Sequence, residues 1–261
     1  MDHVPGSLRA ALIAVENHWT WYRRNWRATA VTSFLQPVLF LLAMGVGFGS
    51  QVQPGEATGG HRYVVFLAPA LLVLTAVQNA MFESTYAVFS SFKWQKTYHG
   101  VVATPVTPAQ VLHGQLLWIA LRLLSGTAVF LAVAVALGAV TSPWAVLAVP
   151  AAVLAGMAFS APVVAYTATR EKPDSFNALY RFALVPMTLF TGAFFPLDQL
   201  PAWLHPLAWA TPVWHGIELA RGAAFGTLAP LPAAGHVAYL AAFVVVGTVL
   251  GRRHFHRRLT A

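Results

Sequence analysis

Few residues in this 261-residue chain could do chemistry, and two of them are charged groups within apolar sequence. Glu83 follows the uncharged run 63–82, and Arg122 lies inside another apolar stretch. An ionised side chain in lipid is costly unless it pairs with an opposite charge or faces a water-filled path. The two are therefore candidate partners near a gate. The alternative for Glu83 is a carboxylate solvated by headgroup water.

Catalytic and cofactor motifs are missing from the sequence. It has no GxxxxGK[ST] loop, no HExxH motif and no cysteine, so P-loop binding of ATP, thiol catalysis and cysteine-bound metals are not expected. Its histidines fall at the ends of apolar segments and in loops, which does not suit haem. Ser125 lacks a His or Asp partner in another apolar segment, which disfavours a protease. We expect no enzyme, no catalytic residue, no metal and no cofactor on this chain.

The composition indicates which elements hold these residues. Hydrophobic residues make up 57% of the chain and charged residues 9%, against about 25% charged in a typical soluble domain. This excludes an ordinary soluble protein and indicates an all-α polytopic membrane protein. A membrane helix needs about 20 apolar residues. The uncharged gaps predict one domain over residues 1–261 with six spans, at about 28–49, 63–84, 108–138, 144–167, 176–195 and 233–251.

The basic residues predict the orientation. If both termini are cytoplasmic, 13 of the 16 Lys and Arg residues lie on the cytoplasmic side, two lie outside and Arg122 lies in the membrane. Positive residues favour the cytoplasmic side, so we expect a multi-pass protein of the cytoplasmic (inner) membrane. The basic residues behind the net charge of +8 lie at the edges of the predicted spans and form no single patch. Membrane lipids, and not nucleic acid, are therefore the expected partners.

Two cytoplasmic segments are not simple spans. Residues 7–26 repeat Leu, Val, Trp and Tyr every three or four positions beside Arg, which predicts an interfacial amphipathic helix. A helix packed on its own domain is the alternative. Residues 85–107 are too polar to span and too apolar for a free linker, and they end in a capping-box pattern at Thr107. They predict a docking helix or, alternatively, a connector resting on the membrane.

The segment 196–232 combines prolines with tryptophans. Proline at this density forbids one continuous helix, while the apolar content disfavours a solvated loop. Short re-entrant helices that enter the outer leaflet satisfy both constraints, provided protein or a water-filled cavity covers them. Glu218 and Arg221 are placed to pair at i and i+3. The candidate residues are Pro196, Trp203, Pro206, Trp209, Pro212, Trp214, Glu218 and Arg221.

Two stretches resemble a known family. The run MFESTYAVFSSFKWQKTYHGVVATP, residues 81–105, resembles the permease subunits of ABC-2 type exporters, and more narrowly the lipo-oligosaccharide (NodJ-type) and daunorubicin-resistance branch. The run FTGAFFPLDQLPAWLHPLAWATPVWHGIELARG, residues 190–222, resembles the extracellular hairpin of that branch. With the six-span order, the resemblance covers nearly the whole chain.

The resemblance implies a homodimer or pseudo-dimer of permeases with the transport path at its interface. Two copies of a separate ATP-binding subunit, which carries ATP and Mg, would dock at the cytoplasmic side. Residues 7–26 would form the connecting helix and residues 85–107 the coupling helix. The positions that match the coupling stretch are Lys93, Trp94, Lys96, Thr97, Tyr98, Thr104 and Pro105.

The cargo is left open by the sequence. Members of that branch export amphipathic drugs, lipids or lipid-linked saccharides, and fold does not decide among them. The residues themselves give six spans, a docking-like helix and no energy motif, which favours an externally powered transporter. A passive channel or a membrane assembly factor is the alternative.

Overall fold

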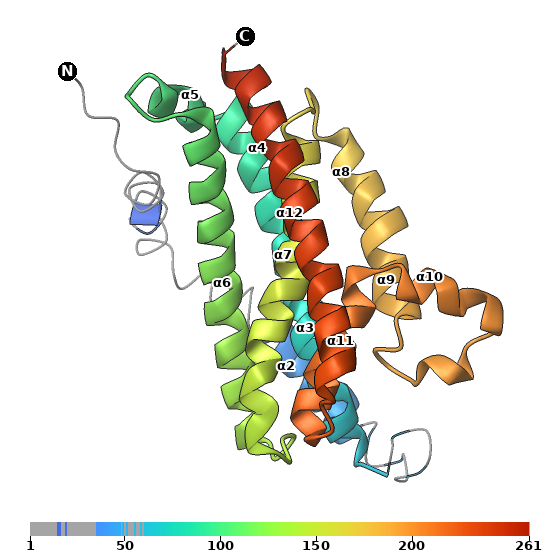
Figure 1. The fold of residues 1–261 in the computed structure, drawn as a ribbon. Coiled ribbons are helices and arrows are strands. Elements are labelled where there is room, and N and C mark those ends of the chain that lie inside the picture. The colour runs from blue at the N-terminus through green and yellow to red at the C-terminus, as the bar shows by residue number, and fades with distance from the viewer. Residues whose placement is uncertain are drawn as a thin grey trace.

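The computed structural model describes residues 15, 16, 19, 35–47, 49, 51, 55, 58 and 60–260 of the chain. Within these residues every regular element is a helix, which confirms the all-α prediction for this part (Figure 1). Four long helices run side by side as a bundle. They are α3 (Tyr63–Ser84), α6 (Pro108–Ala136), α7 (Ala148–Thr167) and α12 (Pro230–Thr260).

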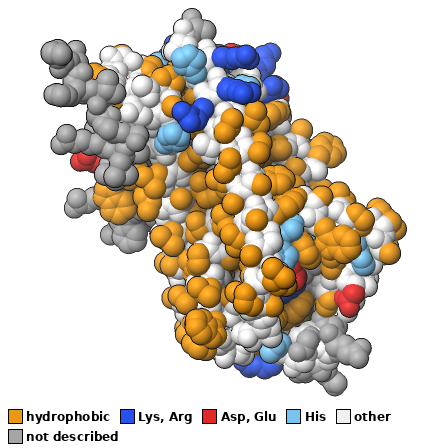
Figure 2. All heavy atoms as spheres, in the orientation of Figure 1, with side chains coloured by type: hydrophobic (Ala, Val, Ile, Leu, Met, Phe, Trp, Pro, Cys, Tyr) orange, Lys and Arg blue, Asp and Glu red, His pale blue; other side chains and the backbone are white. Residues whose placement is uncertain are grey.

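Shorter helices surround this bundle. Lys and Arg side chains gather near the C-terminal end of α12 (Figure 2), and we call this the basic end of the bundle. Below it, apolar side chains cover the visible face of the long helices. The shorter helices are α2 (Gln36–Phe40), α4 (Tyr86–Lys93), α5 (Thr97–Val102), α8 (Asp174–Leu179), α9 (Val185–Phe190), α10 (His205–Trp209) and α11 (Pro212–Phe225).

Four helical segments are long and apolar enough to cross a membrane, and they correspond to the predicted second, third, fourth and sixth spans. The last is longer than predicted, because α12 continues nine residues past Gly251 to Thr260. The predicted end rests on the first charged residues, which mark where a helix leaves the lipid. The helix itself can continue beyond that point. The four segments are Tyr63–Lys93, Pro108–Ala136, Pro143–Thr167 and Pro230–Thr260.

The predicted fifth span, 176–195, ends earlier in the structure. Helix runs from Asp174 to Phe190 with a widened π-helical turn at Tyr180–Leu184, where Arg181 is exposed. It stops because Gly192 adopts a φ of +74°, a left-handed conformation that breaks a right-handed helix. Residues 191–195 are therefore not helical.

The predicted N-terminal helix lies largely outside the described residues, and the predicted first span lies partly outside them. Of the span 28–49, residues 36–47 are helical, through α2 and a wider turn at Leu41–Gly47. Of the predicted interfacial helix 7–26, only Val15, Glu16 and Trp19 are described. The interfacial helix therefore stays a prediction.

Helix starts follow the Ser/Thr-Pro pattern of the sequence. Thr107 and Gln110 form the predicted capping box: Thr107 Oγ1 accepts from the Gln110 amide at 3.3 Å, and Gln110 Oε1 accepts from the Thr107 amide at 2.8 Å. Ser142 and Thr211 likewise accept hydrogen bonds from the amides of Trp144 and Trp214. Each cap precedes a proline that needs no amide partner, so the start of each helix is fixed locally.

Glycines let the helices approach one another closely. A Cβ on Gly247 would lie 2.4 Å from the backbone nitrogen of Pro162 in α7, and one on Gly251 would lie 3.0 Å from Leu112 in α6. A side chain at Gly247 would require movement of the backbone, whereas one at Gly251 would press on the Leu112 side chain. Since lipid supplies no hydrophobic drive between helices, such close packing stabilises the bundle.

Candidate functional site

The hairpin of α4 and α5 stands at the basic end. Helix α4 follows α3 after Thr85, whose hydroxyl donates to the Met81 carbonyl at 2.7 Å. The turn between α4 and α5 places Lys96 at φ +53°, and Lys96 is the one non-glycine residue with positive φ in the described part of the chain. Such a conformation is uncommon for a side chain other than Asn or Asp. It turns the chain sharply, so that residues 93–96 project from the bundle.

Most of the residues predicted to couple to a partner lie on the outside of this hairpin. Trp94 is 62% exposed although it is a large aromatic residue. A tryptophan flanked by two lysines and left in contact with solvent is typical of an interaction surface. The exposed members of the predicted set are Lys93, Trp94, Lys96, Thr104 and Pro105, and Thr97 is half-buried.

Tyr98 differs from the rest of that set because its side chain points inward and is 4% exposed. Its hydroxyl donates to Gln115 Oε1 of α6 at 2.9 Å. Its ring packs against Phe92 of α4 and Phe255 of α12, with centroids 4.8 and 5.6 Å away. Burial raises the pKa of Tyr98, so it stays neutral. Tyr98 therefore holds the hairpin on the bundle and presents no surface to a partner.

Arg258 joins α12 to the end of α7. Its guanidinium donates to the carbonyls of Thr167, Ala168 and Arg170, at 3.2, 2.9 and 2.8 Å. These carbonyls belong to the last residue of α7 and the turn after it, where a positive charge is favourable. The same guanidinium lies 4.5 Å from the centre of the Phe92 ring. Arg258 thus connects α12, α7 and α4.

Glu171 completes this connection from the loop after α7. It forms ion pairs with Lys93 of α4 and with Arg258, the latter at 3.4 Å. The hydrogen bond from Lys93 lowers the pKa of Glu171. Sequence reasoning missed Glu171 and Arg258. Arg258 lies outside the predicted sixth span, which ends at 251, and nothing local indicates which carbonyls it binds.

The predicted pair of intramembrane charges is present. Arg122 Nη1 of α6 lies 3.3 Å from Glu83 Oε1 of α3, and the two side chains are 15% and 9% exposed. Removing one partner from such a pair leaves an uncompensated buried charge, which is strongly destabilising. The pair ties α6 to the last turn of α3, from which the α4–α5 hairpin continues.

The second polar constellation lies where α11 packs on α3. Arg221 is 9% exposed and donates to the carbonyls of Gly192 and Ala193, at 2.8 and 2.9 Å. Tyr63 donates to the next carbonyl, Phe194, at 3.2 Å. The guanidinium also lies 3.9 Å from the centre of the Phe66 ring. Three consecutive carbonyls after α9 are thus bound by two side chains, which we call the Arg221 clamp.

The clamp corrects the predicted pairing of Glu218 with Arg221. No ion pair joins them within residues 60–260. The reason is that Arg221 lies on the face of α11 that packs inward, where the carbonyls left by the end of α9 need donors. Glu218 remains half-buried one turn earlier and acts on Arg221 only through its charge.

The prolines of 196–232 divide this segment as predicted. Pro196 directly precedes a short turn of helix at Leu197–Gln199, and Pro206 and Pro212 lie in the first turns of α10 and α11. Proline fits the first turn because no amide bond is needed there. The segment therefore folds as separate short helices.

The tryptophans of this segment differ in exposure. Trp203 and Trp209 are 76% and 48% exposed, whereas Trp214 packs its ring against His215 and His236. The two histidines face each other with Nδ1 atoms 2.7 Å apart, and His215 Nε2 lies 2.9 Å from the Trp209 carbonyl. This histidine pair joins α11 to α12. No group of three metal-ligating side chains occurs in the described ranges.

Comparison with known proteins gives a consistent result. Residues 10–225 match the model of a family described as ABC-2 type transporter. The chain is also similar to three proteins named nodulation protein J. It is 32% identical to that of Sinorhizobium fredii over 96% of this chain and 98% of the relative. It is 30% identical to those of Rhizobium meliloti, over 93% and 95%, and Bradyrhizobium diazoefficiens, over 95% and 97%.

Proposed function

The chain belongs to the ABC-2 type transporter family, and from this premise we propose that it is the permease subunit of an ATP-driven exporter. Its cargo would be an amphipathic drug, a lipid or a lipid-linked saccharide. The observation that carries the proposal is the exposed turn Lys93–Lys96, which the rest of the hairpin anchors to the bundle. A rigid basic and aromatic projection suits the docking of another subunit.

The partner in this proposal is a separate ATP-binding subunit in two copies, which carries ATP and Mg. The basic end faces the cytoplasm, because Lys and Arg favour that side of a membrane. The exposed lysines suit an acidic surface on the partner. The permease itself acts as a homodimer or pseudo-dimer in the inner membrane, with the path between the two copies.

The contacts of the hairpin support a mechanical role. Movement of α4 and α5 would pass to α7 and α12 through Glu171 and Arg258, and to α6 through Tyr98 and Gln115. The Glu83–Arg122 pair adds a second connection to α6, close to the hairpin. Nucleotide-driven approach of two partner subunits would in this way rearrange the helices. The short helices of 196–232 would close the path on the outer side.

Co-purification tests the proposal. A candidate ATP-binding subunit, sought among the genes next to that of this chain, would be co-expressed with the tagged permease. Its recovery on the permease would be measured, together with ATPase activity in proteoliposomes. Reversing the charge of the turn with Trp94→Glu and Lys96→Glu is expected to reduce recovery at least about tenfold, since like charges across an interface cost several kcal/mol.

Lys172→Glu is the matched control, because Lys172 is also exposed but lies in the loop after α7. It is expected to leave recovery unchanged. If no ATP-binding subunit co-purifies with the unmodified chain, the exporter assignment fails and a passive channel or a membrane assembly factor is favoured. Equal loss in the control and the double variant would instead show that the turn is not the docking surface.

A further inference from the structure

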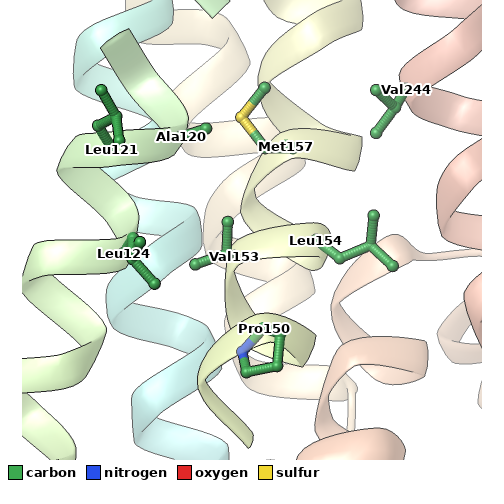
Figure 3. A pocket seen from close by; sticks show the side chains of 8 residues that line it. All are labelled: Ala120, Leu121, Leu124, Pro150, Val153, Leu154, Met157 and Val244. Atoms are coloured by element: carbon green, nitrogen blue, oxygen red, sulfur yellow. The ribbon is translucent and has the colours of Figure 1, made fainter. Parts of the chain in front are cut away.

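A groove of about 360 Å³ opens on the side of the bundle between α6, α7 and α12 (Figure 3). Every side chain that lines it is apolar. Leu121 and Leu124 come from α6, Val153 and Met157 from the middle of α7, and Val244 from α12. Leu121 and Leu124 are 42% and 46% exposed, so the groove is open to the surroundings of the bundle.

The three helices that form the groove are all long and apolar enough to cross a membrane. In a bilayer the groove therefore opens to lipid hydrocarbon. Water has no hydrogen-bond partner on such walls and would not stay there. An alkyl chain is the chemical group that fits both the walls and the setting.

A positive charge lies beyond the end of the groove that points toward the basic end. Arg252 follows Val244 by eight residues on α12, which places it about 12 Å farther along the helix axis. There α12 packs on α6 through Gly251 and Leu112. His113 of α6 is close enough to Arg252 for their charges to interact. Arg252 is exposed and belongs to none of the ion pairs within residues 60–260.

We propose that an anionic phospholipid binds here, with one acyl chain in the groove and its phosphate on Arg252. One leaflet of hydrocarbon is about 15 Å thick, which matches the distance from Arg252 to the groove. Basic residues between membrane helices at this level are a known kind of site for anionic headgroups. The lipid comes from the leaflet at the basic end. It is a bound partner of the permease and not its cargo, so the site is independent of the proposed exporter function.

Native mass spectrometry of the purified full chain tests the charge. The probe is an equimolar mixture of phosphatidylglycerol and phosphatidylcholine with identical acyl chains. Unmodified protein is expected to retain severalfold more phosphatidylglycerol. Arg252→Ala is expected to abolish that preference. Arg253→Ala, which removes the neighbouring exposed arginine, is expected to keep it. Equal retention of both lipids by the unmodified protein, or equal loss in the two variants, overturns the proposal.

Filling the groove tests the acyl chain. Ala120→Leu on α6 and Val153→Phe on α7 add volume to its lining from two different helices. Each is expected to reduce bound phosphatidylglycerol several-fold at an unchanged melting temperature. Val245→Phe is the control, since Val245 is 60% exposed and does not line the groove. The melting temperature shows which filled variants are correctly folded. If these variants bind as much lipid as the control, the groove is not the site.

Discussion

Arg258 and Arg221 perform similar tasks, but only Arg258 has an exposed carboxylate beside it. Each binds carbonyls just beyond the end of a helix, Arg258 after α7 and Arg221 after α9. Arg258 does so beside Glu171, a carboxylate that is 69% exposed. Arg221 is buried, and its neighbours are carbonyls and the ring of Phe66.

The difference indicates what each contact can do. An ion pair in contact with water is worth little and is screened by salt, so it can break and form again at low cost. A buried guanidinium that donates to two carbonyls is costly to disturb, because both the charge and the carbonyls would lose their partners. The basic end is therefore suited to rearrangement, and the Arg221 clamp to holding a fixed geometry.

The largest expected effect is that of Arg221→Ala. The substitution removes two hydrogen bonds from a charged donor and leaves two buried carbonyls without partners, so the free energy of unfolding should fall by about 2–4 kcal/mol. Thermal unfolding in detergent measures this. Arg221→Lys keeps the charge but loses the planar guanidinium, so its stability should lie between those of the unmodified protein and Arg221→Ala. Full stability in Arg221→Lys would show that charge alone suffices and that the carbonyl geometry does not matter.

Arg258→Ala should have a smaller effect, about 1–2 kcal/mol, because Arg258 is less buried than Arg221 and water can replace part of what is lost. Arg257→Ala is the control, since Arg257 is exposed on the same helix. If Arg258→Ala destabilises the protein as much as Arg221→Ala, the contrast between the basic end and the Arg221 clamp is wrong. In the reconstituted complex, Arg258→Ala should also weaken the response of ATPase activity to the permease, whereas Arg257→Ala should not.

The sequence predicted features that depend on neighbouring residues. The caps at Thr107, Ser142 and Thr211 each need only a hydroxyl, a following proline and an amide two or three residues on. Four spans were recognisable because each contains enough consecutive apolar residues for a membrane. The pair of Glu83 and Arg122 could be inferred because an isolated charge in lipid requires a partner and few candidates existed.

What the sequence did not show depends on packing between distant segments. Arg221 was expected to bind Glu218, one turn away, but it binds carbonyls nearly thirty residues earlier, because the helix before Gly192 ends against α11. Tyr98 matched the coupling stretch by position, yet only the fold shows that it points to Gln115. Neighbours in sequence can differ completely in exposure, as Tyr98 and Lys96 do.

The smallest expected effect, and the most specific, is that of Glu171→Gln. The lowered pKa of Glu171 means that its ion pairs stabilise the folded protein above the ordinary pKa of a glutamate and that this contribution is lost as pH falls through the lowered value. Because Glu171 is exposed, the loss in Glu171→Gln should be less than about 1 kcal/mol. It should also disappear in 1 M salt, where the screening length is about 3 Å. The effect of Arg221→Ala should persist in the same salt, because the clamp is buried. Equal salt dependence of the two variants, measured by thermal unfolding at pH 7, would remove the distinction between the exchangeable contacts of the basic end and the fixed clamp.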